Sequence, residues 1–476
     1  SCLVGSEMCI RDRKDRNMKT LIHRLKRFSI YSLMFASIGF VACEDENRQD
    51  MTPEIGEGEV APQITMYTPT SGGKSTSLTL YGTHFGTDLD NIRVTVNGVD
   101  AEVTGALGNI ITANVQRGSG SGLVKVYIGQ GEAAQELTYK TEFEYSQSPI
   151  VSTYIGSYVP AAKTEKKEGT LMEAVLWKPG SIAFDKEGAL YIVEDDDRDV
   201  RIAKNNQVAT FLRGDGTGGT VFRMMNIAFS SDGNTLFLSN DANASGNAHI
   251  ATIPWSNDTH QYDTGNLAAI WSVTSSLGNG VTNVGVHPVT GEVFSVAHGN
   301  AMIYKYDPEQ NTMVATGVQL PDAAGKNAAK VKIRCILFDK AGTTVYMSSQ
   351  EKDVIYKGDY DMSTGEFSNL RVWVGQYEKA GFTEGQGNEA KLEEPCQMDL
   401  DEEGNIYVAV RKKHRIAKIT PDGMLTNYTG TGTSGTTDGP LDKAQFNHPE
   451  GVQFGSDGAL YVSDYWNHKI RKIEKD

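Results

Sequence analysis

Residues 457–473 read Asp-Gly-Ala-Leu-Tyr-Val-Ser-Asp-Tyr-Trp-Asn-His-Lys-Ile-Arg-Lys-Ile. An Asp-Gly turn opens the segment, and two runs of alternating apolar and polar residues follow it on either side of a polar turn. Alternation with a period of two predicts β-strands, each with one buried face. Two short strands cannot bury that face alone, so the segment must be one part of a larger β-structure.

The same pattern occurs five more times toward the N-terminus, with a period of roughly 45 to 60 residues. Each copy has an apolar strand, a turn with glycine, and a second strand that carries an aromatic residue. The apolar runs are 181–185, 226–230, 283–287, 335–339, 397–401 and 451–455, and the aromatic residues are Tyr191, Phe237, Phe294, Tyr346, Tyr407 and Tyr461. Six such units over residues 150–476 predict a six-bladed β-propeller.

The segment 457–473 resembles the NHL repeat and includes that family's Asp-x-x-Asn-His core at Asp464, Asn467 and His468. Residues 403–416 keep the frame of the repeat but lack the Asp. The three core residues are expected to tie the strands of the blade together rather than to bind a ligand.

The last repeat lacks an outer strand. Residues 151–156, Val-Ser-Thr-Tyr-Ile-Gly, resemble the outer strand 425–430, Leu-Thr-Asn-Tyr-Thr-Gly. We therefore expect residues 151–156 to complete the last blade and to leave the ring without an open sheet edge.

A separate β-domain precedes the repeats, at residues 62–146. Short alternating runs separated by Gly, Asn and Asp turns predict a β-sandwich there. The run 80–86, Leu-Tyr-Gly-Thr-His-Phe-Gly, resembles the IPT/TIG family of immunoglobulin-like domains. Gly82 and Gly86 are expected to adopt turn conformations that other residues avoid, and Phe85 is expected to fill the core.

The N-terminal 61 residues are expected to contain an extension, an export leader and a tether. Residues 1–17 resemble a non-native extension, and residues 18–42 form a basic and then apolar leader that is too short to span a bilayer in the mature protein. The leader ends in Val-Ala-Cys, which resembles a bacterial lipobox with Cys43 as the lipidated residue, although a general cleavage site beside a chance cysteine is the alternative. Residues 43–61 are acidic and contain Gly and Pro, and they predict a flexible tether. The residues directly after Cys43 resemble the tag that sends Bacteroidetes lipoproteins to the outer face of the outer membrane.

Charge and cysteine content exclude some functions. The chain carries a net charge of −15, and residues 43–476 alone carry −20. Nucleic acid is therefore not expected as a partner, because its phosphates would be repelled. After Cys43 only Cys335 and Cys396 remain, which is too few for a disulfide framework or a cysteine metal site.

The candidate site lies at the end of the propeller where the loops before the inner strands meet the turns after the second strands. A ring of planar polar groups and aromatic rings is expected there, which suits ligands rich in hydroxyl groups. The candidate residues are Trp466, Tyr465, Arg411, Arg334, Glu194, Asn240, His298, Gln350 and Glu450.

No catalytic motif and no cofactor are expected. The acidic run Glu194 to Asp199 places carboxylates as a calcium loop does, but no distal Glu completes it, so a solvated loop is favoured.

The resemblance implies a non-catalytic lipoprotein that binds a polysaccharide or oligosaccharide and assists Bacteroidetes glycan uptake, with an outer-membrane transporter as partner. Two alternatives remain open. One is a divalent-metal lactonase or lyase that uses Glu194, Asn283, Asp464 and His298, and the other is a protein-interaction scaffold.

Overall fold

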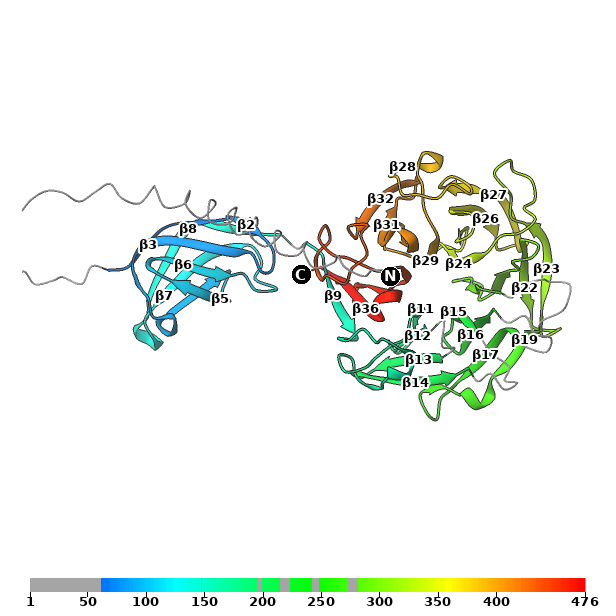
Figure 1. Ribbon diagram of the computed structural model, residues 1–476, viewed down its shortest axis with the longest axis horizontal. Helices are drawn as coiled ribbons and strands as arrows, with labels where there is room; N and C mark the ends of the chain where they lie inside the picture. The colour runs from blue at the N-terminus through cyan, green and yellow to red at the C-terminus, as the bar shows by residue number, and fades with distance from the viewer. Residues whose placement is uncertain are drawn as a thin grey trace, which may run out of the picture. The chain divides into compact units, whose positions relative to one another are not determined.

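The computed structural model describes residues 61–146, 148–194, 199–214, 223–241, 248–272 and 281–475. The expected leader, the expected lipidation site Cys43 and most of the expected tether lie outside these ranges. The described residues form β-strands linked by turns and short 3-10 helices. They make two β-structures in succession, a sandwich and a propeller (Figure 1).

The sandwich contains eight strands in the order β1-β3-β6-β5-β4-β7-β8-β2. They are β1 (Gln63–Thr68), β2 (Ser71–Gly72), β3 (Ser77–Gly86), β4 (Ile92–Val96), β5 (Val99–Ala106), β6 (Gly108–Asn114), β7 (Gly122–Ile128) and β8 (Gln135–Tyr145). Alternate residues of these strands enclose one apolar core that includes Leu78, Leu80, Val94 and Phe143. This confirms the predicted sandwich.

The Gly-x-x-Phe-Gly corner of β3 closes one side of that core. Phe85 is buried as expected, and Gly86 has a left-handed backbone with φ of 80°. Gly82 serves a different purpose from the one expected. A Cβ atom there would lie 2.0 Å from the carbonyl oxygen of Gln63 and 2.2 Å from the Phe85 ring, so Gly82 is needed because β1 and Phe85 approach its backbone closely.

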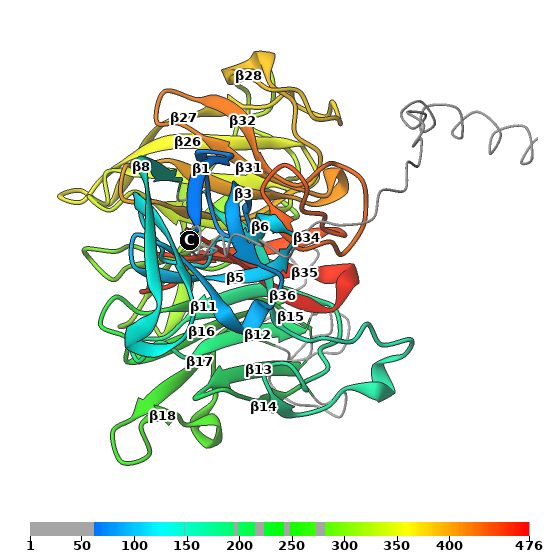
Figure 2. The ribbon, with the colours of Figure 1, turned by 90° about the vertical axis from the view of Figure 1, so that its left-hand side faces the viewer.

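The propeller has six blades, one sheet each, arranged around a common axis (Figure 1). Blade 1 contains β10 (Gly169–Thr170), β11 (Pro179–Phe184), β12 (Leu190–Glu194), β13 (Asp199–Lys204) and β14 (Gln207–Arg213). Blade 2 contains β15 (Met224–Phe229), β16 (Thr235–Asn240), β17 (Ala248–Ser256), β18 (Gln261–Tyr262) and β19 (Ala268–Ser272). Blade 3 contains β20 (Gly285–Val286), β21 (Val293–Val296), β22 (Met302–Asp307) and β23 (Thr312–Gln319). Figure 2 shows the sheets of blades 1 and 2 side by side.

Blades 4 to 6 follow the same plan. Blade 4 contains β24 (Ile333–Phe338), β25 (Thr344–Ser349), β26 (Val354–Asp361) and β27 (Glu366–Val374). Blade 5 contains β28 (Gly385–Gln386), β29 (Pro395–Leu400), β30 (Ile406–Val410), β31 (Arg415–Ile419) and β32 (Met424–Thr429). Blade 6 contains β33 (Gly439–Pro440), β34 (Pro449–Phe454), β35 (Leu460–Asp464), β36 (Lys469–Glu474) and β9 (Ile150–Ile155). The predicted fold class, a β-sandwich followed by a six-bladed propeller, is confirmed.

The repeated aromatic residue of the second strand joins neighbouring blades. All six of these residues are buried. Tyr461 of blade 6 packs edge-on against Phe184 of blade 1 at 4.9 Å between ring centres, and Tyr407 of blade 5 meets Phe454 of blade 6 at 5.2 Å. Edge-to-face pairs add to the apolar burial that holds blades together.

The ring closes through β9. This strand pairs antiparallel with β36, and Ile155 lies opposite Ile470. Val151 and Ile155 of β9 are buried. The expectation that residues near 151–156 complete the last blade is confirmed.

Candidate functional site

We call one end of the propeller the mouth. It is built from two kinds of segment. The first kind is the residues that enter each inner strand, and the second is the turns between the second and third strands. Backbone hydrogen bonds join the two kinds, as between Arg411 and Glu394 in blade 5 and between Trp466 and Asn447 in blade 6. The side chains of both segments therefore gather at one end.

Four charged side chains form a continuous network at the mouth. Glu450 of β34 accepts hydrogen bonds from Arg334 of β24 and from Arg411, each at 2.6 Å. Arg411 also donates to Glu394 at 2.7 Å. Glu450 and Arg334 are buried, and Arg411 and Glu394 are partly exposed. The network thus runs from blade 4 to blade 6, with its open side on Arg411 and Glu394.

Strand register explains how blade 4 reaches blade 6. Arg334 and Glu450 are each the second residue of an inner strand, and the corresponding residue of β29 in blade 5 is Cys396. The small Cys396 side chain is fully buried, and burial raises the pKa of its thiol to about 12. A small neutral residue at this position leaves space for the ion pair to pass across blade 5.

Neighbouring opposite charges stabilise the charged forms of Glu394 and Arg411. Burial disfavours the charge of Glu394, but Arg411 and Lys412 outweigh this effect and hold its pKa below the usual range. Burial likewise disfavours the charge of Arg411, and Glu450 and Glu394 raise its pKa in spite of it. Gln350 donates to Glu394 at 3.3 Å, so a fifth residue, the fourth of those predicted, joins the set.

An aromatic surface borders this network. Tyr465 and Trp466 lie in the short 3-10 helix η7 (Tyr465–Asn467) between β35 and β36. The Trp466 side chain is 40% exposed, whereas Tyr465 is buried under it, with the rings 5.4 Å apart. The guanidinium of Arg411 lies 5.4 Å from the centre of the Tyr465 ring. Trp466 is therefore the exposed aromatic residue beside the charged network.

Six predicted residues therefore come together: Arg334, Arg411, Glu450, Gln350, Tyr465 and Trp466. The other three do not. His298 lies in blade 3 and pairs with Glu351 at 3.0 Å. Glu194 and Asn240 are fully buried inside their own blades.

Glu194 and Asn240 occupy the position that Asp464 holds in the NHL signature. Each is the last residue of a second strand and accepts the backbone N–H of a residue that enters the inner strand. The donors are Trp177 for Glu194, Arg223 for Asn240 and Asn447 for Asp464. The sequence pattern placed these residues at the mouth but did not show that their side chains turn inward to the backbone.

The signature residues stabilise blade 6. Asp464 also accepts from Asn467 at 2.7 Å and from the buried Arg471 at 2.8 Å. The expectation that Asp464, Asn467 and His468 hold strands together agrees with these contacts. Asn283 has a similar role, because it bonds the backbone of Val296 in both directions.

The candidate metal donors Glu194, Asn283, Asp464 and His298 are thus each held by protein partners. Within the described ranges, no group of three or more His, Cys, Asp or Glu side chains is arranged to hold a metal ion. The centre of the acidic run Glu194 to Asp199, residues 195–198, lies outside those ranges. Asp199, at its end, bonds Lys166 at 2.6 Å.

A hydrogen bond that recurs between neighbouring blades was not predicted from the sequence, and we call it the latch. Lys178, Glu394 and His448 each precede a proline, and each has a left-handed backbone with φ between 49° and 56°. Their N–H groups donate to the preceding blade, at His468, Asp353 and His414 respectively. The recurring X-Pro pair is the signal in the sequence that could have revealed this latch.

The latch also brings Lys178 to the aromatic surface. Its ammonium lies 4.3 Å from the centre of the Trp466 ring and 5.4 Å from that of Trp177. Trp177 in turn packs on the ring of His468 at 4.7 Å. Lys178 is a residue of the site that the sequence interpretation missed.

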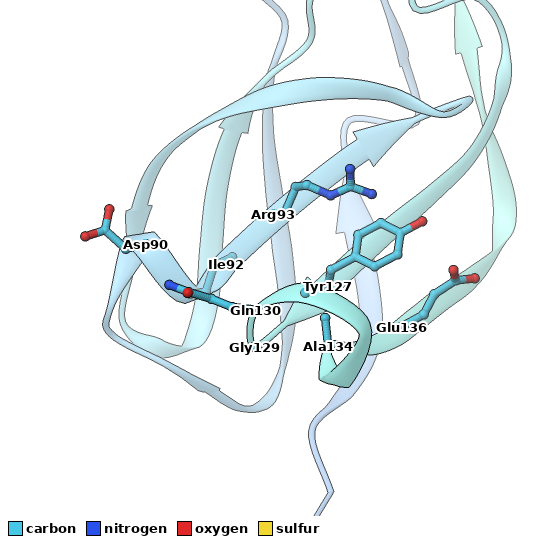
Figure 3. A pocket seen from close by; sticks show the side chains of 9 residues that line it. Asp90, Ile92, Arg93, Tyr127, Gly129, Gln130, Ala134 and Glu136 are labelled. Atoms are coloured by element: carbon cyan, nitrogen blue, oxygen red, sulfur yellow. The ribbon is translucent and has the colours of Figure 1, made fainter.

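The sandwich has a pocket of its own, with a volume of about 570 Å³. Figure 3 shows Arg93, Tyr127, Gln130 and Glu136 around it. The Arg93 guanidinium lies 4.2 Å from the centre of the Tyr127 ring and covers one face of it. One face of the aromatic ring in this pocket is therefore already in contact with a side chain of the same domain.

Three family models match parts of the chain. The IPT/TIG domain matches residues 62–145, the SMP-30/Gluconolactonase/LRE-like region matches residues 294–438, and the NHL repeat matches residues 446–473. The chain carries an IPT/TIG domain followed by NHL/SGL-type repeats.

Two curated relatives match short segments of this chain. They are the chloroplastic protein SUPPRESSOR OF QUENCHING 1 of Arabidopsis thaliana, 33% identical over 97 residues, and NHL repeat-containing protein 2 of Gallus gallus, 35% identical over 81 residues. The matches cover 20% and 17% of this chain, but only 9% and 11% of those proteins.

Several solved structures match most of this chain. Auxiliary nutrient binding proteins from Bacteroides thetaiotaomicron and Bacteroides ovatus match with TM-scores of 0.69 and 0.67 at 22% and 23% identity. These matches cover 87% and 88% of this chain and 98% and 99% of theirs. A candidate phosphatase from B. thetaiotaomicron matches with a TM-score of 0.67 at 22% identity, over 87% of this chain and 97% of its own. At this identity the likeness shows a shared fold.

Among the described residues, no helix has the length and apolar character needed to cross a membrane.

Proposed function

We propose that this protein binds a polysaccharide or oligosaccharide at the mouth of the propeller and assists nutrient uptake. The observation that carries the proposal is the exposed indole of Trp466 next to the Tyr465 ring, which the guanidinium of Arg411 approaches. An aromatic face packs against the C–H side of a sugar ring, and planar charged groups bond its hydroxyls in pairs.

The rigidity of the network supports a binding role. Glu450 holds Arg334 and Arg411 from two other blades, so the guanidinium of Arg411 is positioned before any ligand arrives. Groups fixed in advance lose less conformational entropy when a ligand binds. Two proteins with the same fold that are described as auxiliary nutrient binding proteins support the accessory role.

The location is a further part of the proposal. Lipidation at Cys43 would anchor the chain in the outer membrane, and the acidic residues after it would direct it to the outer face. A glycan-binding protein held there would pass its ligand to an outer-membrane transporter, which is the partner we propose.

Two other functions remain as alternatives. The match of residues 294–438 to the SMP-30/Gluconolactonase/LRE-like region favours a lactonase-type enzyme. The four donors considered for its metal are already bonded to backbone groups, Arg471 or Glu351, which is why we place binding first. A protein-interaction scaffold is the third function.

A glycan array probed with residues 43–476, with and without EDTA, tests the proposal. We expect retention on a subset of glycans that EDTA leaves unchanged. Hydrolysis of a lactone that EDTA abolishes would favour the enzyme instead. Absence of binding to every glycan on the array would contradict the proposal.

A further inference from the structure

We propose that the mouth binds an oligosaccharide of at least two sugar rings, which extends from Trp466 in blade 6 toward blade 5 and accepts a hydrogen bond from Nε2 of His414. This inference rests on the proposed function and adds the length of the ligand, its direction across the mouth and a second contact residue. It follows from the hydrogen bonds that fix the histidine rings beside Trp466.

Three rings follow one another from blade 6 to blade 5. The centre of the Trp466 ring lies 6.4 Å from that of His448, which lies 4.6 Å from that of His414. The Trp466 side chain is exposed, and both histidines are partly exposed. All three residues belong to the segment 281–475, which the structure describes without a gap. The surface next to Trp466 on this side is therefore built from imidazole rings.

The latch determines which nitrogen of His414 carries the proton. His414 follows the 3-10 helix η6 (Arg411–Lys413), and its Nδ1 accepts the backbone N–H of His448 over 3.1 Å. A ring nitrogen that accepts a hydrogen bond carries no proton, so the proton of the neutral ring is on Nε2. Burial and the nearby Lys413 lower the pKa of His414, which favours that neutral form. His414 thus presents an N–H donor on the side of the ring away from the latch.

The neighbouring ring, that of His448, presents an acceptor. Its Nδ1 lies 3.0 Å from the side-chain oxygen of Asn447. An amide oxygen only accepts, so Nδ1 carries the proton and Nε2 is left as an acceptor. Burial lowers the pKa of His448 to about 4, and His414 and Arg411 act in the same direction. A hydroxyl group both donates and accepts, so sugar hydroxyls match the two rings.

The two Nε2 atoms are available to a ligand. Among the described residues, no group of the protein bonds Nε2 of His414 or of His448. Neither atom is among the buried polar atoms that lack a partner. Both atoms are therefore in contact with solvent, and a ligand hydroxyl that replaces the water restores the hydrogen bond it displaces.

The direction toward blade 5 follows from a difference between the latches. On the blade 1 side of Trp466 the latch uses His468, which is 4% exposed and packs against the Trp177 ring at 4.7 Å between centres. The latch between blades 4 and 5 uses the carboxylate of Asp353 in place of an imidazole. In the described part of the mouth, the partly exposed imidazoles therefore adjoin Trp466 on the blade 5 side.

These positions suit a ligand longer than one sugar unit. The first ring packs its C–H side on the Trp466 indole. The next ring along the chain reaches His414 and His448 and adds hydrogen bonds to them. Little side-chain entropy is lost in this step, because the latch already holds the His414 ring. A single sugar unit packed on Trp466 lacks the second set of contacts, so affinity should increase with length.

The test measures how affinity depends on the length of the ligand. Calorimetry with residues 43–476 uses xylo-, cello-, manno- and malto-oligosaccharides of one to six units. Fragments of the same lengths from any other glycan that the array retains complete the set. For the glycan that binds, we expect affinity to rise about threefold to tenfold between one unit and two or three units, the gain typical of one added hydrogen bond.

His414→Asn removes the ring donor. Asn tolerates the left-handed backbone of this position, which has φ of 52°, and its side-chain oxygen can still accept the N–H of His448. This variant should bind a single unit as the unmodified protein does and should lose the gain with length. Trp466→Ala should weaken binding at every length. His260→Asn is the control, because His260 also has a left-handed backbone but pairs with Glu187 in the turn between β11 and β12, away from the mouth.

NMR of the imidazole nitrogens in the unmodified protein gives a second measurement, which does not depend on the folding of a variant. The His414 ring should carry its proton on Nε2, and this signal should shift when the three-unit fragment of the bound glycan is added.

The outcomes separate the two proposals. Equal affinity for one unit and for longer fragments would overturn the extended ligand and leave the proposed function intact. The same holds if His414→Asn keeps the gain with length, or if the His414 signal does not shift at saturation. Binding of no glycan at any length would contradict both proposals.

Discussion

The Nδ1 atom of His468, in blade 6, accepts a hydrogen bond from the backbone N–H of Lys178, in blade 1, over 3.1 Å. A ring nitrogen accepts only when it carries no proton. The bond between the last and the first blade therefore requires a neutral imidazole. Burial and the nearby Lys178 ammonium favour that form and lower the pKa of His468 to about 4.

We predict that His468 makes the protein less stable in acid. In the unfolded chain this side chain takes up a proton below about pH 6.5, but in the fold only near pH 4. Stability is therefore complete above pH 6.5 and is lost as the pH falls toward 4, by at most about 3 kcal/mol. His468→Asn keeps an acceptor and tolerates the left-handed backbone, so its free energy of unfolding should depend less on pH in this range.

The measurement is urea denaturation at several pH values between 4 and 7. His260→Asn is a matched control, because His260 also has a left-handed backbone but is 74% exposed. That variant should follow the unmodified protein. Parallel pH curves for His468→Asn and the unmodified protein would contradict the prediction.

Loss of the shared carboxylate should destabilise the propeller. Glu450→Gln leaves Arg334 buried without its carboxylate and weakens the support of Arg411, which we expect to cost about 3 kcal/mol of unfolding free energy. Glu402→Gln is the control, because its pair with Lys340 is exposed and should contribute less than about 1 kcal/mol. Denaturant titration of both variants measures the difference, and equal stabilities would show that the network contributes little.

Trp466→Ala should reduce glycan affinity roughly tenfold to hundredfold, the loss typical of an aromatic stacking surface. The melting temperature should remain almost unchanged because the indole is 40% exposed. Met424→Ala, with a side chain 41% exposed on the outer strand of blade 5, is the control for loss of exposed apolar surface. A large fall in melting temperature for Trp466→Ala would instead identify a packing residue.

Removal of β9 should open the ring. A fragment of residues 148–476 keeps the pairing of β9 with β36 and should remain monomeric. A fragment of residues 157–476 exposes the edge of β36 and should aggregate. Light scattering after size-exclusion chromatography distinguishes them, and two equally monomeric fragments would show that β9 is dispensable.

Anchoring depends on Cys43 in the proposed location. Cys43→Ala should release the protein from the detergent-soluble membrane fraction of the native cell. Changing Glu44, Asp45 and Glu46 to Ala should keep the anchor but protect the protein from external protease. Detergent partitioning that is unchanged in Cys43→Ala would exclude lipidation at this residue.

The architecture was predictable because it follows from local patterns. The turns with glycine, the alternating strands and the buried aromatic residue recur in every blade, and each has a short-range physical cause. Strand β9 was identified by its likeness to the strand at 425–430. The position of each candidate residue at the mouth followed from the repeat register.

The direction of individual side chains was not predictable in the same way. Glu194 is the last residue of a second strand and Arg411 directly follows one, yet Glu194 turns inward to the backbone of Trp177 and Arg411 turns toward Glu450. The choice depends on partners in other segments, such as Arg201 beside Glu194. Similarly, the path from Arg334 to Glu450 depends on the small Cys396 between them, which a repeat pattern does not indicate.

Strand β9 has a consequence for the order of events during synthesis. Its partner β36 comes about 300 residues later, as the contact between Ser152 and Lys472, 320 positions apart, illustrates. The first strand of the propeller must therefore wait for the last, and contacts this distant in sequence form slowly. A chain that stops before β36 leaves β9 without its partner, with a free edge open to aggregation or proteases. The pairing of β9 with β36 thus distinguishes a finished ring from an interrupted one.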